Sequence, residues 1–467
     1  MLNNFELQST FKITNTMITE DNLKSIGTWF RESVLIKMVL IGFLTLALLI
    51  PSFLIQDLIL ERQARQQEVI DEITDKWSGA QLVQGPIMVL PYKTTVSQRD
   101  TSGRVTYKEV ITTINILPET LNIRGNSDAK TKKRGIYNTV VYTSKILVNG
   151  KFSALELVKS GINPDMVLWS KAKVVIGLSD LKGLKNNPVI KLNNTPYEVE
   201  TDFSSLKLFK NNLVVLPDLT ATKNTAISFS FNLDLLGSNE LNFLSLGKNT
   251  EVNMKGIWKD PSFIGRYLPD ESVIKDSIFS ASWKIPYFNR PLPQQWIEEN
   301  AAIDMQNKDI SFGVRFILPV DQYQKTMRTA KYAILIILLT FISLFFTELL
   351  SKKRVHLLQY ILIGAAMTIY YTLLLSFSER LGFNLAYIIA SVATVLLISS
   401  FIAVLIKNKH TALIFGGILS IFYTFIFVTI QLQDLALMFG SIGLFIIVAA
   451  LMYLSTRIDW LKRTSTD

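Results

Sequence analysis

The sequence contains no cysteine and only two histidines, His356 and His410, among its 467 residues. Without cysteine the chain forms no disulfide and no cysteine-based metal or redox site. Neither histidine falls in the long polar middle of the chain, which argues against a zinc site there and excludes a Ser-His-Asp triad. Charged residues are also scarce, at 18% against 49% hydrophobic residues, and the mean hydropathy is +0.30. This composition indicates a membrane protein with a substantial polar part.

Six stretches are long and apolar enough to cross a membrane, which takes about 20 residues. The first is 38–55, and the others follow a long polar interval, at 332–350, 357–377, 383–406, 412–430 and 435–455. The loops between the last five are short, which predicts a tight bundle of antiparallel neighbours. The first stretch lacks a small-residue cleavage site, so we expect an uncleaved anchor and not a signal peptide.

Basic residues beside these stretches predict their orientation. If the spans alternate in direction, the short loops 378–382 and 431–434 lie on the same side of the membrane. Their only basic residue is Arg380. The opposite side collects Lys24, Arg31, Lys37, Lys352, Lys353, Arg354, Lys407, Lys409, Arg457, Lys462 and Arg463. Positive flanks stay cytoplasmic, so both termini are expected inside and residues 56–331 in the periplasm. The net charge of +10 is thereby placed at membrane edges, and no nucleic-acid partner is expected.

The segment after the anchor changes its hydrophobic period along the chain. Residues 56–79 have no interior Gly or Pro and carry Val69, Ile70, Ile73 and Trp77 at helical spacing, with Gly79 as a C-terminal cap. This predicts a helix that continues out of the membrane and packs on the polar domain.

From about residue 81 the period is two, which predicts strands with one face in a core. The alternating apolar residues are Ile227, Phe229, Phe231, Leu233 and Leu235, then Val252, Met254 and Trp258, and finally Phe279, Ala281, Trp283 and Ile285. Asn149-Gly150 predicts a two-residue hairpin turn. We therefore expect an antiparallel β-sandwich or elongated sheet, as one sandwich or two.

Three Ser-x-x-Lys spacings occur, at Ser170/Lys173, Ser179/Lys182 and Ser204/Lys207. A catalytic lysine must be desolvated, and these lie in polar or alternating stretches. They are therefore interpreted as chance spacings. No cofactor or metal is expected.

Ionisable groups inside spans are costly and often functional. Glu348 is interpreted as an interfacial carboxylate paired with the basic turn at Lys352. Polar groups also gather around the turn after the third span: Tyr370, Tyr371, Ser376, Ser378, Glu379, Arg380, Asn384 and Tyr387. Either they lock this turn beneath the polar domain, or they line a small site.

Several blocks of the chain resemble the CreD family of inner-membrane proteins. They include "ERQARQQEVIDEITDKWSGAQLVQGPIMVLPY", "DPSFIGRYLPDESVIKDSIFSASWKIPYFNRPLPQQW" and "LSFSERLGFNLAYIIASVATVLLIS", and they extend from about residue 33 to 400 in the same order. The chain departs from the family pattern at Leu357, where a Pro is typical, and at Arg380, where a His is common. The second departure argues against a proton-shuttling His at that turn. The resemblance implies a stress-linked protein of cell-envelope integrity and colicin tolerance, with no known reaction.

These observations predict an α+β membrane protein with six transmembrane helices, one N-terminal and five C-terminal. A large antiparallel β-sandwich-like extracytoplasmic domain follows the first helix. The expected segments are a cytoplasmic tail 1–37, an anchor 38–55, its helical extension 56–79, a β-rich domain 80–331, a five-helix bundle 332–456 and a cytoplasmic tail 457–467.

The expected function is non-enzymatic support of the envelope, through a β-domain that binds an envelope partner. Membrane lipid and an envelope protein are the expected partners, and the sequence does not set the oligomeric state. The alternative is a carrier or lipid-handling protein that uses the five-helix bundle. Against it, the spans after the domain number five and show no paired repeat.

Overall fold

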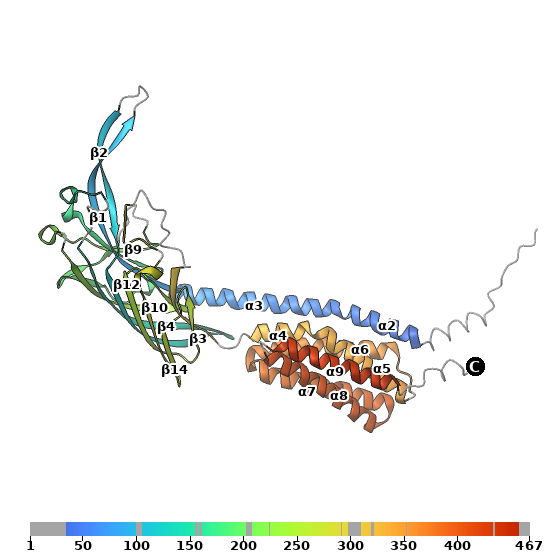
Figure 1. Cartoon of the computed structure of the whole chain (residues 1–467). Coiled ribbons are helices and arrows are strands. Elements are labelled where there is room, and N and C mark those ends of the chain that lie inside the picture. The colour runs from blue at the N-terminus through green and yellow to red at the C-terminus, as the bar shows by residue number, and fades with distance from the viewer. Residues whose placement is uncertain are drawn as a thin grey trace, which may run out of the picture. The chain divides into compact units, whose positions relative to one another are not determined.

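The computed structural model describes residues 34–99, 105–154, 157, 161–201, 208–223, 225–290, 292–297, 310–318, 322–351, 353–432 and 435–456. The chain divides into two compact units, one comprising Met1–Gln63 with Asp321–Asp467 and the other Ala64–Val320. The first unit is helical and the second is built mainly from strands (Figure 1). The helical unit resumes at Asp321, before the boundary at 331/332 that the sequence suggested.

The helices of the described residues account for all six expected spans. Their bounds are α2 Val34–Ala47, α3 Leu49–Trp77, α4 Gln322–Lys331, α5 Ala333–Ser351, α6 Leu357–Leu381, α7 Phe383–Ile406, α8 Lys409–Gln431 and α9 Ala436–Thr456. Within the described part of the chain, six helices are long and apolar enough to cross a membrane, if α2 and α3 are taken as one run from Ile36 to Trp77. The two join through Leu48, whose amide donates to the Leu44 carbonyl at 3.0 Å.

Small residues allow close helix packing in this unit. A Cβ on Gly364 of α6 would lie 2.3 Å from Cδ1 of Leu48 and 3.2 Å from Cζ of Phe341. A Cβ on Gly416 of α8 would lie 2.5 Å from the Ser399 hydroxyl oxygen of α7. Both glycines therefore let helices approach more closely than any larger residue permits. By contrast, α9 buries none of its residues.

The second unit contains two sheets. The described strands are β1 Gln81–Arg99, β2 Val105–Ile116, β3 Thr120–Arg134, β4 Tyr137–Phe152, β5 Lys173–Leu178, β6 Val189–Leu192, β7 Thr195–Glu198, β8 Glu200–Thr201, β9 Asn212–Val215, β10 Ile227–Ser238, β11 Glu240–Leu244, β12 Asn249–Ile257, β13 Pro261–Gly265, β14 Glu271–Lys275, β15 Ile278–Ile285, β16 Gln295–Ile297 and β17 Ser311–Phe316. One sheet has the order β13-β17-β11-β1-β5-β9-β8, and in addition β2 pairs with β1 and β16 pairs with β2. The other has the order β14-β15-β12-β3-β4-β10-β6-β7.

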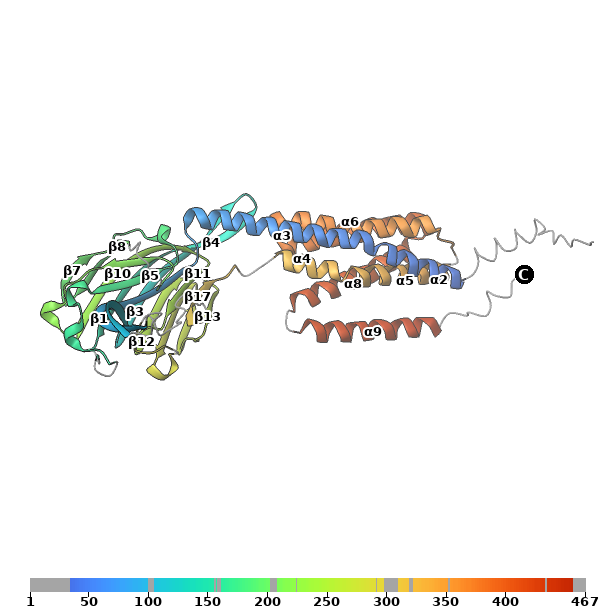
Figure 2. The ribbon, with the colours of Figure 1, turned by 90° about the horizontal axis from the view of Figure 1, so that it is seen from above.

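Most strand pairs are antiparallel, as expected, but β1 runs parallel to β11 and β12 runs parallel to β3. Both sheets contribute to a single hydrophobic core (Figure 2). Aromatic side chains join the sheets across it: the rings of Tyr142 and Phe316 lie 5.1 Å apart, and those of Trp283 and Phe312 lie 5.7 Å apart. The unit is therefore one sandwich, which settles the choice that the sequence left open.

The predicted alternation in β10, β12 and β15 is confirmed, because the apolar residues that alternate there are buried. The exception is Trp258, which lies beyond the end of β12 and is half-buried.

The hairpin predicted at Asn149-Gly150 is wrong. Strand β4 runs straight through it: Gly150 pairs with Leu121 on one side and Phe229 on the other. The turn between β3 and β4 lies at Gly135-Ile136, where Gly135 has φ +61°. Gly150 is required for packing, since a Cβ there would lie 2.0 Å from the Thr120 carbonyl oxygen.

Candidate functional site

The turn between α6 and α7, which the sequence singled out, is formed by Gly382. This residue has φ +78°, a value that favours glycine, and its amide donates to the Ser378 carbonyl at 3.1 Å. The polar residues of the turn have different surroundings. Ser378 is buried and donates to the Leu375 carbonyl at 2.8 Å, whereas Ser376 and Arg380 are exposed.

Glu379 contacts a residue that the sequence did not associate with it. Its half-buried carboxylate accepts a hydrogen bond from the Tyr323 hydroxyl of α4 at 3.0 Å. Arg380 forms no ion pair with any residue that the structure describes. A hydrogen bond to an ionised carboxylate is about twice as strong as one between neutral groups. Glu379 therefore fixes α4 to the end of α6.

A second polar chain connects α4 with α7 and α8. Asn384 accepts from the side-chain amide of Gln431 at 2.6 Å, and Gln431 accepts from the Lys325 ammonium at 2.8 Å. Lys325 also lies 5.8 Å from the ring centroid of Phe383. Helix α4 was not predicted from the sequence, although Tyr323, Thr326 and Ala330 are spaced for one helical face and are buried.

Four tyrosines from α6, α7 and α8 cluster further along these helices. The ring of Tyr370 lies 4.9 Å from that of Tyr371, 6.1 Å from that of Tyr387 and 5.0 Å from that of Tyr423. Tyr387 donates to the Tyr423 carbonyl at 2.7 Å. The hydroxyls of Tyr371 and Tyr423 are buried without a hydrogen-bond partner among the described residues. A buried unpaired hydroxyl costs about 1–3 kcal/mol, so the cluster is suited to hold a polar group of a ligand.

Glu348 belongs to α5 and lies near the N-terminal end of α6, away from the turn between α6 and α7. It links three helices. Its buried carboxylate forms an ion pair with Lys37 of α2, and it accepts from the Tyr360 hydroxyl of α6 at 3.2 Å. Lys37 also donates to the Val355 carbonyl at 3.1 Å. Lys352, the partner that the sequence suggested, lies outside the described residues. The carboxylate therefore ties α2 to α5 and α6 through a residue far away in the sequence.

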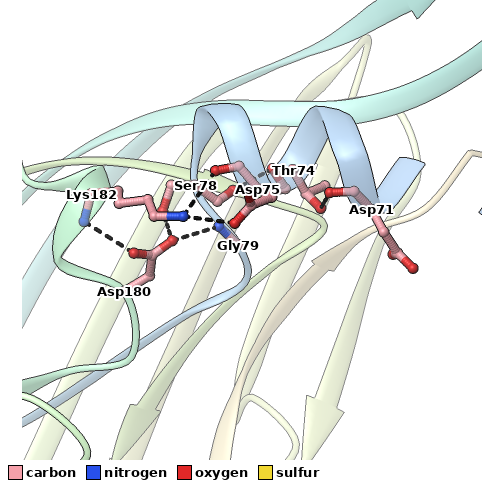
Figure 3. Close-up of polar contacts among 8 residues, drawn as sticks. Asp71, Thr74, Asp75, Ser78, Gly79, Asp180 and Lys182 are labelled. Atoms are coloured by element: carbon pink, nitrogen blue, oxygen red, sulfur yellow. Dashed lines mark hydrogen bonds and ion pairs between the residues drawn. The ribbon is translucent and has the colours of Figure 1, made fainter. Parts of the chain in front are cut away.

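In the β-sheet unit, polar contacts gather where α3 ends (Figure 3). The Asp180 carboxylate accepts from the Gly79 amide at 3.0 Å, the Lys182 amide at 3.0 Å and the Ser78 hydroxyl at 3.1 Å. Lys182 extends to the Asp75 carboxylate of α3, at 2.6 Å.

The predicted helix is confirmed over residues 56–77. Of its predicted apolar stripe, Ile73 is buried, whereas Val69, Ile70 and Trp77 are half-buried. Gly79 does not form the predicted cap, because its φ is not positive and its amide is bound by Asp180.

The Ser179/Lys182 spacing does not bring its two side chains together as a pair. The Ser179 hydroxyl donates to the Ala80 carbonyl at 2.7 Å, and Lys182 is paired with Asp75. Ser204 and Lys207 lie outside the described residues. Among those described, no group of three or more His, Asp or Glu side chains is arranged to hold a metal.

Comparisons with known proteins agree on one family. Residues 33–461 match the family model of the inner membrane protein CreD. The chain is 30% identical over 424 residues to the inner membrane protein CreD of Escherichia coli (strain K12), covering 91% of this chain and 93% of that protein. A solved protein of Parabacteroides distasonis, described as a candidate protease, matches 55% of this chain and 50% of its own at 8% identity and a TM-score of 0.21. That likeness is too weak to support any argument.

Proposed function

Because the chain belongs to the CreD family of inner-membrane proteins, we propose that it supports the integrity of the bacterial envelope under stress, without catalysing a reaction. In this proposal the β-sheet unit lies in the periplasm and binds an envelope protein. The observation that carries it is an exposed two-stranded arm formed by β1 and β2, which extends beyond the other strands (Figure 1).

Charge at the span ends supports the placement of the β-sheet unit. Lys37, Lys353, Arg354, Lys407 and Lys409 flank the spans on the side assigned to the cytoplasm, whereas Arg380 is the basic residue of the short opposite turn between α6 and α7. Basic residues in short loops resist translocation. Residues 64–320 then fall on the periplasmic side, and both termini in the cytoplasm.

The arm exposes apolar side chains. From Lys93 paired with Ile111 to Arg99 paired with Val105, β1 and β2 bond only to each other among the described strands. Alternation places Val105, Tyr107 and Ile111 on one face, with 46%, 76% and 59% of their surface exposed. A free two-stranded ribbon is marginally stable in water. The Lys93–Glu109 ion pair lies on the same face. Exposed apolar side chains bordered by polar ones are typical of interaction sites, so the arm is suited to bind another protein.

The test is a pull-down of the full chain from native membranes in a mild detergent. The double variant Tyr107→Ser with Ile111→Ser should lose a reproducible envelope protein while its abundance stays normal. Val96 is exposed on the opposite face of the arm, so Val96→Ser is the matched control and should keep the partner. If the double variant and the parent recover the same proteins, the arm is not the binding surface.

A second function is favoured by the buried hydroxyls of Tyr371 and Tyr423 in the helical unit. Such groups inside a bundle would suit the polar head of a lipid, which makes lipid handling the alternative. Tyr371→Phe and Tyr423→Phe should then reduce co-purifying lipid, whereas Tyr332→Phe, at the start of the bundle, should not. Lipid content that is equal in all variants would argue against this alternative.

A further inference from the structure

The sheet that contains β3 and β4 has an open groove of about 930 Å³ on its polar face. Three cations line it, Arg124 of β3, Lys145 of β4 and Lys255 of β12. All three are exposed, while Ile123, Gly125, Ile146 and Met254, their neighbours in the chain, are buried on the core side. The groove is therefore formed by the outward side chains of central strands.

Strand register brings the cations together. Lys255 pairs with Asn126, and Asn126 pairs with Lys145, so these residues form one row across three strands. Arg124 lies in the adjacent row, where its partner in β4 is Leu147. It is thus a diagonal neighbour of Lys145, at about 7–8 Å between Cα atoms. The three positive charges converge on one stretch of the sheet.

Among the described residues, none of these three cations forms an ion pair. Asp234, which pairs with Lys145 in the strand register, also lines the groove, so the charges of the lining residues sum to +2. Arg124 is a diagonal neighbour of both Lys145 and Lys255, and like charges at this separation repel one another. Lysines often protect the edges of a sheet from pairing, but β3, β4 and β12 are interior strands. A bound anion would remove the repulsion.

Amide side chains complete the lining. Asn126 and Asn253 lie beside the cations in the two rows. At the rim, Asn186 accepts from the Asp234 amide at 2.9 Å and donates to the Asn232 carbonyl at 3.2 Å, which fixes its position against β10. Amides hydrogen-bond both as donors and as acceptors, so they suit hydroxyl groups. None of the lining residues is aromatic, so the groove offers no stacking surface for a neutral sugar ring.

From this combination we infer that the groove binds an acidic oligosaccharide. Its carboxylate or phosphate groups contact Arg124, Lys145 and Lys255, and its hydroxyls contact the asparagines. The groove crosses β12, β3, β4 and β10, and strands lie about 4.8 Å apart, so the lined span is about 14 Å. This matches a short chain of sugars. The inference deepens the proposed function, because it rests on the placement of the β-sheet unit in the periplasm, where envelope polysaccharides are available.

The test titrates the full chain, purified in an uncharged detergent, with four probes by calorimetry. They are an oligogalacturonide that carries carboxylates, a phosphorylated oligosaccharide, a neutral maltohexaose and inorganic phosphate. We expect binding of one or both acidic oligosaccharides that weakens as salt is raised, and no binding of maltohexaose. The two acidic probes distinguish a carboxylate ligand from a phosphate ligand.

Lys145→Gln and Lys255→Gln should each weaken binding about tenfold, since a charged hydrogen bond is replaced by a neutral one. Lys108→Gln, an exposed lysine of the β2 arm, is the matched control and should bind as the parent does. Equal binding of maltohexaose, an equal loss in the control, or equally tight binding of inorganic phosphate would overturn the inference. Lys145→Gln should still recover the envelope protein in the pull-down, which separates this test from that of the arm.

Discussion

Asp180 shows how one residue joins a helix to a sheet. Its partial burial opposes ionisation, but the hydrogen bonds from the amides of Gly79 and Lys182 and from the Ser78 hydroxyl outweigh that effect and lower the pKa of its carboxyl. Since the pKa is lower in the folded chain than in the unfolded one, the stabilisation is complete at neutral pH. It is lost as the pH falls from about 4 through the folded value.

The first prediction concerns Asp180→Asn. An amide cannot accept these three hydrogen bonds as strongly as a carboxylate, so the variant should melt at a lower temperature at neutral pH. Its melting temperature should also fall less than that of the parent between about pH 5 and about pH 3. The exposed Asp128→Asn is the control and should follow the parent. A parallel acid profile for Asp180→Asn and the parent would contradict the assignment.

The second prediction concerns Gly150 in β4. A Cβ at this position would lie 2.0 Å from the Thr120 carbonyl oxygen and 2.6 Å from Cζ of Phe229. The carbonyl is backbone and cannot move away easily, so Gly150→Ala should destabilise the β-sheet unit by about 1–3 kcal/mol. The check is the thermal melting of the full chain. Gly79→Ala is the control, since its Cβ would have its nearest neighbour at 4.0 Å.

The third prediction concerns Glu379. Glu379→Gln keeps the shape and an acceptor oxygen but loses the charge that strengthens the bond from Tyr323, at a cost of about 1 kcal/mol. We expect normal abundance and insertion, with loss of complementation of an envelope-stress phenotype in a deletion strain. Tyr323→Phe should give the same defect.

Exposed Ser376 is the comparison position for Glu379, and Ser376→Ala should complement fully. Full complementation by Glu379→Gln would remove the reason to regard this turn as a site. A fall in abundance, in contrast, would show that Glu379 only locks the structure.

At the scale of elements, α4 is held to the bundle by the polar chain from Lys325 through Gln431 to Asn384. Gln431→Leu removes the central member and leaves two polar groups unpaired. We expect α4 to open more often, so trypsin should cleave after Lys325 several-fold faster. Thr424→Val, an exposed position of α8, is the control. Cleavage at the parental rate in Gln431→Leu would show that this chain does not hold α4.

The elements that could be predicted from the sequence are those that depend on local periodicity. The faces of β10, β12 and β15 follow from alternation, and the six spans follow from length and hydropathy. Strand β1 could not be interpreted in this way, because Ile87, Met88, Val89 and Leu90 are all buried, on both of its faces. The prediction of a hairpin at Asn149-Gly150 was wrong because turn propensity is a local property. Gly150 is instead needed for close packing against Thr120 and Phe229, which lie on the two neighbouring strands.

The candidate site, too, could be predicted only where local sequence was sufficient. Polar residues inside apolar helices could be recognised from composition, so Glu348 and Glu379 were found. Their partners could not, because Lys37 and Tyr323 belong to helices distant in the sequence. An ion pair between helices depends on how they pack, which one-dimensional spacing does not contain.

At the scale of the whole molecule, the proposed function depends on the side of the membrane on which each unit is exposed. Basic residues oppose translocation because they must leave water and cross the bilayer against the membrane potential. Lys353 and Arg354 follow α5, Lys407 follows α7, and Lys409 is the first residue of α8. With alternating spans, these two loops share one side of the membrane. Residues 64–320 then lie on the other side.

The last prediction tests this arrangement with a reporter enzyme that is active only outside the cytoplasm. Fused after Asp180, it should be active, because the β-sheet unit is expected in the periplasm. Fused after Arg354, it should be inactive, because that loop carries the positive charges that stay inside. Replacing Lys353 and Arg354 by Gln should raise the activity of the second fusion, since the charges that retain the loop are then gone. Activity after Arg354 together with inactivity after Asp180 would reverse the orientation, and would leave the arm and the groove on the cytoplasmic side, where neither an envelope protein nor an envelope polysaccharide could reach them.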